Sequence, residues 1–319
     1  MGNCKSKNCD IKSMKVNDVM IKDPDEMANK FNKYFSDIGK QLARKIREPD
    51  IPFSEMCSSI QCNQSSMFLV LTSRIEIEKV ISELKDRNSG VDYIHTRVLK
   101  AIARYISPVL ERVLNDCISS GHWSVPLKQA DIVPVFKSGN AAVIDNYRPI
   151  SLISNLAKIV EKLIHSRLIV FLEKFCRIKK EQYGFLRNVN TTGLLDRIVN
   201  EIHESVNKDE AVLATIIDLS KAFDTGQHDL LLTKLEIQGI RGLALKLMRS
   251  YLSDRGQKLK INGVTSQVKT VGTGGPQDSA LGPLLFIIYV NDIFNYCPGT
   301  YAFANDTIVV NHADAWSEV

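Results

Sequence analysis

The sequence predicts an α+β protein, in which long amphipathic helices and short strands follow one another without a repeating unit. Three observations indicate this fold class. Apolar residues recur at three- and four-residue steps over several long stretches, as they do on one face of a helix. Short runs of β-branched residues end at turn-forming residues, which is typical of strands and hairpins. Of the 319 residues, 44% are hydrophobic and 24% are charged, so the chain can bury a core.

The first part of the chain predicts three helices. One covers residues 24–46, where apolar side chains fall on one face. A second begins near Ser73 and ends near residues 88–90, which read Asn-Ser-Gly. The third covers residues 97–118 and contains Pro108, where a kink or break is expected because proline has no N–H to donate.

The middle of the chain predicts a strand, a helix and a second strand. Residues 130–136 form a short β-rich segment interrupted by Pro134, and residues 157–175 form a strong amphipathic helix. The basic residues of this helix lie off its apolar stripe and are Lys158, Lys162, Arg167 and Lys174. We expect them to face solvent; contact with a nucleic-acid backbone is the alternative. Residues 211–217 are continuously apolar and predict a buried strand that ends in Asp218.

The last part of the chain predicts helices and two hairpins. The helices are expected over residues 225–240, 243–252 and 279–292. Residues 258–271 form the first hairpin, because the Asn262-Gly263 pair suits a type I′ turn. Residues 301–310 form the second, a tight hairpin around the pair Asn305-Asp306.

Charge and cysteine content restrict the function only weakly. Lys plus Arg total 41 and Asp plus Glu total 36, and the net charge of +5 permits a nucleic-acid partner without indicating one. The seven cysteines are odd in number and scattered, which suits free thiols in a reducing compartment. Cys4 with Cys9 and Cys57 with Cys62 could hold zinc, but their spacing is wider than usual and no histidine lies nearby.

Membrane attachment is not indicated either. The longest apolar run, residues 281–290, is far shorter than the roughly 20 residues of a transmembrane helix, and no secretory signal opens the chain. Residues 1–6 fit the pattern for N-terminal myristoylation at Gly2. Short patterns of this kind match by chance, so we favour the interpretation that Met1 is an arbitrary start within a longer reading frame.

Two acidic residues are candidates for chemistry: Asp218, after an apolar strand, and Asp306, in a hairpin turn. Carboxylates at strand ends can hold Mg²⁺, which prefers oxygen ligands together with substrate phosphates. Two such ions can activate a 3′-hydroxyl and stabilise a leaving pyrophosphate. The structural alternative is that Asp218 caps a helix and Asp306 forms a turn. Spacing alone favours this alternative.

Five ordered motifs change that balance. They are Asp-Asn-Tyr-Arg-Pro-Ile-Ser-Leu at 145–152, Gln-Tyr-Gly-Phe at 182–185, Asp-Leu-Ser-Lys-Ala-Phe-Asp at 218–224, Gly-Gly-Pro-Gln-Asp-Ser-Ala-Leu-Gly-Pro-Leu-Leu-Phe at 274–286 and Phe-Ala-Asn-Asp at 303–306. Together they resemble the reverse transcriptases of non-LTR (LINE-type) retrotransposons, jockey-like elements especially. Five motifs in order are far more specific than any single short match.

The resemblance implies the fingers and palm of a right-hand polymerase. Residues 1–66 would form a helical N-terminal extension and linker, residues 67–120 a helical segment leading into the fingers, and residues 121–319 the reverse transcriptase fingers and palm. The implied reaction is RNA-templated addition of deoxynucleotides to a DNA 3′-end with two Mg²⁺ ions. The implied partners are an RNA template, a DNA primer and deoxynucleoside triphosphates.

The resemblance also implies a role for seven residues, which are Lys137, Arg148, Asp218, Phe223, Gln277, Asn305 and Asp306. Asp218 would be the first metal ligand and Asp306 the second acid of the hairpin. Lys137 and Arg148 would hold the triphosphate, and Gln277 would contact the template or the nascent base pair. Phe223 would exclude a ribose 2′-hydroxyl, although a core-packing role would explain it equally well.

Several residues depart from the family pattern. The family has aspartate where Asn305 stands, and the neutral amide offers a metal only one weaker oxygen. The family has glycine where Asp278 stands, which places a side chain and a negative charge where backbone should approach the substrate. Residue Leu186 is inserted before Arg187, and Gly226-Gln227 replaces Val-Asn. Loss of metal-borne charge stabilisation predicts an activity about two to four orders of magnitude lower.

The hypothesis is therefore a truncated and partly degenerate copy, whose status as an active enzyme is open. The motifs end close to residue 319, so the thumb and the rest of the palm are expected to be missing, and no endonuclease region is expected before the N-terminal segment. One alternative is a non-catalytic nucleic-acid-binding remnant, and another is a translated pseudogene without a stable fold. The expected location is intracellular, in nucleus or cytoplasm.

Overall fold

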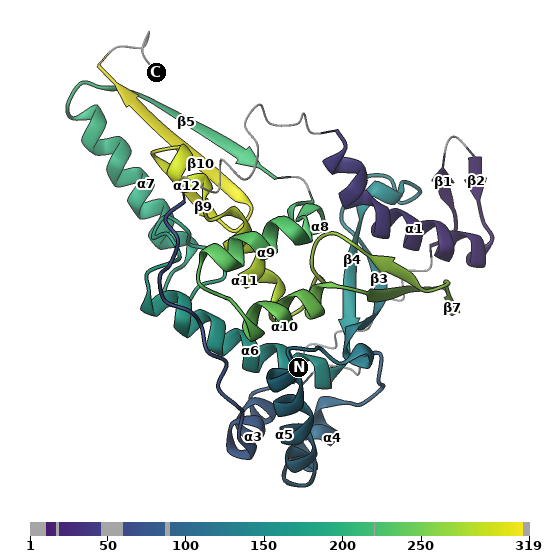
Figure 1. Cartoon of the computed structure of the whole chain (residues 1–319). Coiled ribbons are helices and arrows are strands. Elements are labelled where there is room, and N and C mark those ends of the chain that lie inside the picture. Colours follow the sequence, from purple (N-terminus) through teal and green to yellow (C-terminus); the bar gives the residue numbers. More distant parts are fainter. Residues whose placement is uncertain (1–10, 17–18, 46–59, 87–89, 220, 315–319) are drawn as a thin grey trace.

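The computed structural model describes residues 11–16, 19–45, 60–86, 90–219 and 221–314 (Figure 1). The myristoylation pattern at Gly2, both members of the Cys4/Cys9 pair and Cys57 lie outside these residues. Within the described part of the chain, none of the helices combines the length and the apolar character that a membrane span requires. The described strands form three sheets, of five, three and two strands, and helices pack between and beside the two larger ones (Figure 1).

The first sheet has the strand order β4-β3-β6-β7, with β8 also paired to β6. Its strands are β3 (Gln129–Phe136), β4 (Tyr147–Ile153), β6 (Arg255–Ile261), β7 (Val264–Thr265) and β8 (Lys269–Val271). The helix α1 (Pro24–Ala43) packs against this sheet and buries Met27, Phe31 and Phe35 in a shared core. The short strands β1 (Met14–Val16) and β2 (Val19–Ile21) pair with each other beside it.

The second sheet has the order β5-β10-β9, formed by β5 (Ala211–Asp218), β9 (Thr300–Phe303) and β10 (Asp306–Ala313). The helix α7 (Thr191–Val206) packs on it through Leu194 and Ile198. The prediction of a strand ending in Asp218 is confirmed, but the prediction that this strand is buried is wrong. Among the strands that the structure describes, β5 pairs with β10 alone and forms the edge of the sheet, and most of its side chains are exposed, with Ile216 at 77%.

A large helical core lies between the sheets and holds the molecule together. It is built on α3 (Arg74–Ser82), α4 (Thr96–Ala101), α5 (Ala103–Ser120), α6 (Asn155–Lys174), α9 (His228–Ile237), α10 (Leu243–Leu252) and α11 (Gly282–Val290). Shorter elements connect these pieces: η1 (Val125–Lys128), η2 (Ile144–Asn146), α8 (Ala222–Thr225) and α12 (Ile293–Tyr296). Trp123 and Tyr251 stack edge to face within this core, with ring centroids 4.7 Å apart.

The break expected at Pro108 lies elsewhere. The predicted helix is divided at Ile102, between α4 and α5, and Pro108 is accommodated inside α5. A proline at position 108 cannot donate to the carbonyl of Arg104 four residues earlier. The helix nevertheless continues through this position, and the hydroxyl of Ser107 donates to Glu78 Oε1 at 2.8 Å and lies 3.5 Å from the carbonyl of Arg104.

The prediction that the basic residues of α6 face solvent is wrong for two of them. Arg167 donates from both terminal nitrogens to the carboxylate of Glu76 at 2.8 Å, and its side chain is 12% exposed. Lys158 is also largely buried and lies 3.8 Å from the Asp278 carboxylate. Neighbouring segments cover more of this helix than its apolar stripe, so residues that lie off the stripe are also buried. Lys174, at the end of the helix, is exposed as expected.

Both predicted hairpins are present, but the turn of the second lies one residue earlier than predicted, at Ala304 and Asn305, so Asp306 belongs to β10 and not to the turn. Asn262 and Gly263 have φ values of 49° and 80°, the two positive angles that a type I′ turn requires, and they join β6 to β7. The second hairpin joins β9 to β10 across Ala304 and Asn305. It carries the acidic residues to the edge of a cavity.

Candidate active site

The side chains of Asp218, Asn305 and Asp306 meet where β5 ends and β10 begins. Asp306 lies directly opposite Asp218 in the antiparallel register, which brings their β-carbons to roughly 5 Å. The amide nitrogen of Asn305 donates to Asp218 Oδ1 at 3.2 Å and to Asp306 Oδ1 at 3.4 Å. The juxtaposition expected from the motifs is therefore present in the structure.

The Gln-Tyr-Gly-Phe motif at 182–185 is bound to the turn of this hairpin by a hydrogen bond. The buried side chain of Gln182 accepts hydrogen bonds from the backbone N–H of Gly184 at 2.7 Å and of Ala304 at 3.0 Å. A β-carbon on Gly184 would lie 2.2 Å from the nitrogen of Ala304, so only glycine allows the two segments to approach this closely. The motif thus fixes the position of the acidic turn.

The donor set fits a divalent cation only in part. Asp218 and Asp306 offer carboxylates side by side, and hard cations such as Mg²⁺ prefer such oxygen ligands. Asn305 instead turns N–H donors toward both carboxylates, and its own oxygen is neutral. Among the residues that the structure describes, no group of three or more His, Cys, Asp or Glu side chains is arranged to hold a metal ion.

The hairpin opens onto a cavity of about 850 Å³ between the two sheets. All seven residues that the motifs single out line it, namely Lys137, Arg148, Asp218, Phe223, Gln277, Asn305 and Asp306. The two cations come from the strand and loop region of the first sheet, and the carboxylates come from the second. A ligand with phosphates and a metal-binding end could therefore contact both sets in one cavity.

Phe223 packs against other aromatic rings, as the core-packing alternative predicts, and its proposed exclusion of a 2′-hydroxyl stays a prediction. Its ring packs on Phe286, with centroids 4.6 Å apart, and edge to face on Phe185 at 5.8 Å. It also lines the cavity. Because two aromatic neighbours hold the ring, it forms a rigid wall of the cavity.

Sequence reasoning missed a polar cluster in the cavity wall. The Lys221 ammonium lies 2.7 Å from Asp145 Oδ1, and the Tyr34 hydroxyl hydrogen-bonds to both of these side chains. Hydrogen bonds from Lys221 and Tyr34 hold the pKa of Asp145 below its usual range. The cluster ties α1 to the Asp-Leu-Ser-Lys-Ala-Phe-Asp motif at 218–224. The apolar periodicity of residues 24–46 gave no signal that Tyr34 reaches this site.

A second residue that the sequence did not single out supports the loop after Gln277. Glu161, on α6, is 1% exposed and accepts hydrogen bonds from the Tyr251 hydroxyl at 2.8 Å and from the backbone N–H of Ala280 at 2.7 Å. Burial raises the pKa of this carboxyl above its usual value. The sequence signal that could have indicated this role is the charge of Glu161 next to the apolar Val160 in the predicted helix at 157–175.

Asp278 adopts a left-handed conformation, with φ of 73°. This is the position at which the family pattern has glycine, and the structure shows why glycine suits it. We expect Asp278→Gly to relieve about 0.5 kcal/mol of left-handed strain, offset by loss of the ion pair with Lys158, and to lower the KM for the incoming nucleotide severalfold, because a negative charge leaves the cavity. Thermal unfolding and primer-extension kinetics measure the two effects.

The matched control for this change is Asp209→Gly. Asp209 also has a positive φ, 60°, but lies exposed in the turn after α7 and outside the cavity. It should show the relief of strain without the change in KM. Equal KM changes in both variants would contradict the assignment of Asp278 to the substrate cavity.

Comparison with known proteins places this geometry in a family. A family model described as reverse transcriptase (RNA-dependent DNA polymerase) matches residues 135–315, which contain all five motifs. The chain is 29% identical over 253 residues to the RNA-directed DNA polymerase from mobile element jockey of Drosophila melanogaster, covering 79% of this chain and 28% of that protein.

Two further relatives from Drosophila melanogaster are similar. The probable RNA-directed DNA polymerase from transposon BS is 28% identical over 247 residues, which cover 75% of this chain and 27% of that protein. The corresponding protein from transposon X-element is 28% identical over 217 residues, covering 68% of this chain and 24% of that protein. The chain thus spans about a quarter of the length of the curated relatives it matches.

Proposed function

The chain belongs to the reverse transcriptase (RNA-dependent DNA polymerase) family, and we propose that it acts as the RNA-directed DNA polymerase domain of a jockey-like retrotransposon. The proposed reaction adds deoxynucleotides to a DNA 3′-end on an RNA template. The observation that carries this proposal is the register that places Asp306 opposite Asp218 in a cavity also lined by Lys137 and Arg148.

Each side chain has a role in this proposal. Lys137 and Arg148 bind the triphosphate, for which a planar guanidinium offers paired donors. Asp218 and Asp306 hold Mg²⁺, which stabilises the negative charge that develops on the phosphate oxygens during transfer. The ring of Phe223 lies against the sugar and leaves no room for a 2′-hydroxyl. Asn305 weakens the site, because it adds no charge to the carboxylate pair.

The proposal is tested with a primed RNA template, deoxynucleoside triphosphates and either Mg²⁺ or Mn²⁺. We expect slow extension by the purified chain and a further loss of about 10³-fold or more with Asp218→Ala, because one of two metal-binding carboxylates is removed. Asp196→Ala is the matched control, since Asp196 is exposed on α7 and does not line the cavity. It should extend the primer as the unchanged chain does.

A second candidate function is nucleic-acid binding without catalysis. The observation that favours it is the amide of Asn305 between the two carboxylates, where a cation would otherwise lie. In this case primer–template binding weakens steeply with rising salt, as expected for phosphate contacts, and the unchanged chain does not extend the primer. Extension by the unchanged chain would exclude this alternative, whereas extension that appears only after Asn305→Asp would support it.

A further inference from the structure

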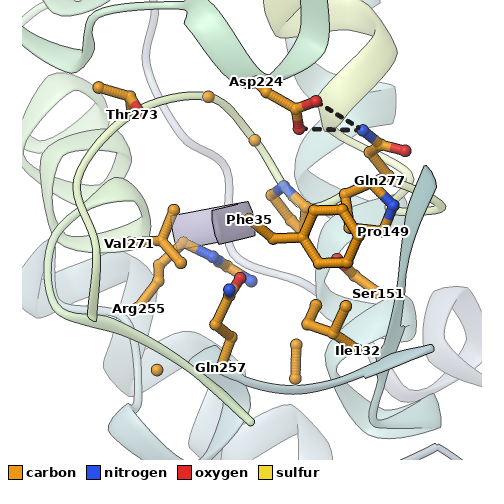
Figure 2. A pocket seen from close by; sticks show the side chains of 15 residues that line it. Phe35, Ile132, Pro149, Ser151, Asp224, Arg255, Gln257, Val271, Thr273 and Gln277 are labelled. Carbon is orange, nitrogen blue, oxygen red and sulfur yellow. Dashed lines mark hydrogen bonds between the residues drawn. The ribbon is translucent and has the colours of Figure 1, made fainter. Parts of the chain in front are cut away.

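The side chain of Gln277 is held by a residue with no assigned role. Its amide nitrogen donates to both oxygens of the Asp224 carboxylate, at 2.9 Å and 3.2 Å (Figure 2). A carboxylate accepts hydrogen bonds and an amide nitrogen donates them, so Gln277 must turn its nitrogen toward Asp224. Its carbonyl oxygen is therefore the polar atom left to face other groups.

The backbones that carry these two side chains are fixed to each other. The carbonyl of Gln277 accepts from the N–H of Ser151 at 3.1 Å, and the N–H of Gly275 donates to the carbonyl of Phe223 at 3.1 Å. A β-carbon on Gly274 would lie 2.4 Å from that same carbonyl oxygen. The loop after β8 thus lies directly on α8, and the bond between Asp224 and Gln277 forms within a rigid frame.

Asp224 lies in the wall between two cavities. It lines the large cavity and also a small one, as Gln277 does, and the small one is lined by Phe35, Ile132 and Arg255 as well (Figure 2). Burial raises the pKa of Asp224, while the hydrogen bond from Gln277 and the charge of Lys221 oppose that rise. Burying a carboxyl is costly unless it is hydrogen-bonded, and the bonds from Gln277 compensate part of that cost.

We propose that Asp224 is a positioning residue that fixes the amide orientation of Gln277, so that Gln277 offers an acceptor oxygen to the substrate. This inference rests on the proposed polymerase function. An amide oxygen in the large cavity binds a hydroxyl or amino group of the nucleotide or nascent base pair and disfavours a phosphate oxygen. Asp224 itself acts only through Gln277.

The orientation can be measured without any catalysis. In ¹⁵N-labelled protein, the side-chain amide proton of Gln277 that points at Asp224 should exchange slowly with solvent, because it is shared between the two carboxylate oxygens. Gln277→Met identifies the side-chain amide signals by removing them. Asp224→Ala should speed the exchange at least tenfold, and the closer mimic Asp224→Asn should give an intermediate rate in a folded chain. An unchanged exchange rate in both Asp224 variants would overturn the proposal.

The effect on substrate is measured in a chain that also carries Asn305→Asp. Asp224→Asn should raise the KM for deoxynucleotides about tenfold with a smaller change in kcat, because it loosens binding rather than the metal site. Asp224→Asn combined with Gln277→Glu restores a donor–acceptor pair of reversed polarity and should recover most of the lost affinity. If Asp224 had a purely structural role, the double variant would not regain nucleotide affinity. A double variant without this gain would therefore count against the positioning role.

The two measurements separate this inference from the proposed function. If the Asn305→Asp chain extends no primer, the polymerase proposal fails, and the amide exchange still decides whether Asp224 holds Gln277. If extension is robust but neither the exchange nor the KM responds to Asp224, the polymerase proposal stands and the positioning role is rejected.

Discussion

Replacing Asn305 by aspartate is expected to raise the rate of primer extension by about two to four orders of magnitude. The change removes the N–H donors that now face Asp218 and Asp306 and supplies a third carboxylate at the same place. Metal ions contribute several kcal/mol of charge stabilisation to such transfers, and each 1.36 kcal/mol corresponds to about tenfold in rate. Extension rates at increasing Mg²⁺ concentration measure the effect.

The control for this prediction is Asn305→Ala, which removes the amide without adding charge and should give no gain. A second readout does not depend on activity. Without metal, three neighbouring carboxylates repel one another, so Asn305→Asp should melt at a lower temperature in EDTA than the unchanged chain. Mg²⁺ binds the folded state only and should restore the melting temperature. If Asp and Ala at position 305 behaved alike, the metal-site interpretation would be refuted.

Local signals in the sequence were sufficient for most elements and for the centre of the site. The Asn262-Gly263 pair specifies its turn because few residues adopt two consecutive positive φ angles. The run before Asp218 and the pair at 305–306 each predict an element from neighbouring residues. That the two meet in register followed from the family motifs, not from periodicity, because pairing between segments almost ninety residues apart leaves no local pattern.

Features that depend on distant packing were not predictable from local patterns. Tyr34 reaches the cavity because α1 packs on the first sheet, and the strand before Asp218 is exposed because it has one partner strand in place of two. Arg167 is covered because α3 supplies Glu76 to it. In each case the residue types were compatible with several environments, and tertiary contacts selected one. The division of the chain at residues 66 and 120 stays a prediction.

Removing the carboxyl of Glu161 is expected to cause the largest loss of stability among these variants. Glu161→Ala should lower the free energy of unfolding by about 3 kcal/mol, because it leaves the Tyr251 hydroxyl and the N–H of Ala280 without a buried acceptor. The loop that carries Gln277 should loosen with it. Urea unfolding at neutral pH measures the loss, and a change below about 1 kcal/mol would show that the contact is not structural.

The conservative variant Glu161→Gln separates hydrogen bonding from charge. The amide oxygen can accept from Ala280, and the Tyr251 hydroxyl can turn to accept from the amide nitrogen, so stability should be largely kept.

Burial raises the pKa of Glu161 in the folded state, so the unchanged chain binds a proton here more tightly when folded. The stability that this tighter proton binding adds is fully present below the pKa that Glu161 has in the unfolded chain. It is lost as pH rises through the pKa of Glu161 in the folded chain. Glutamine has no proton to lose, so unfolding measured across this range should show a shallower decline in Glu161→Gln. Parallel pH profiles for the two proteins would mean that the carboxyl at the base of the Gln277 loop does not titrate differently on folding.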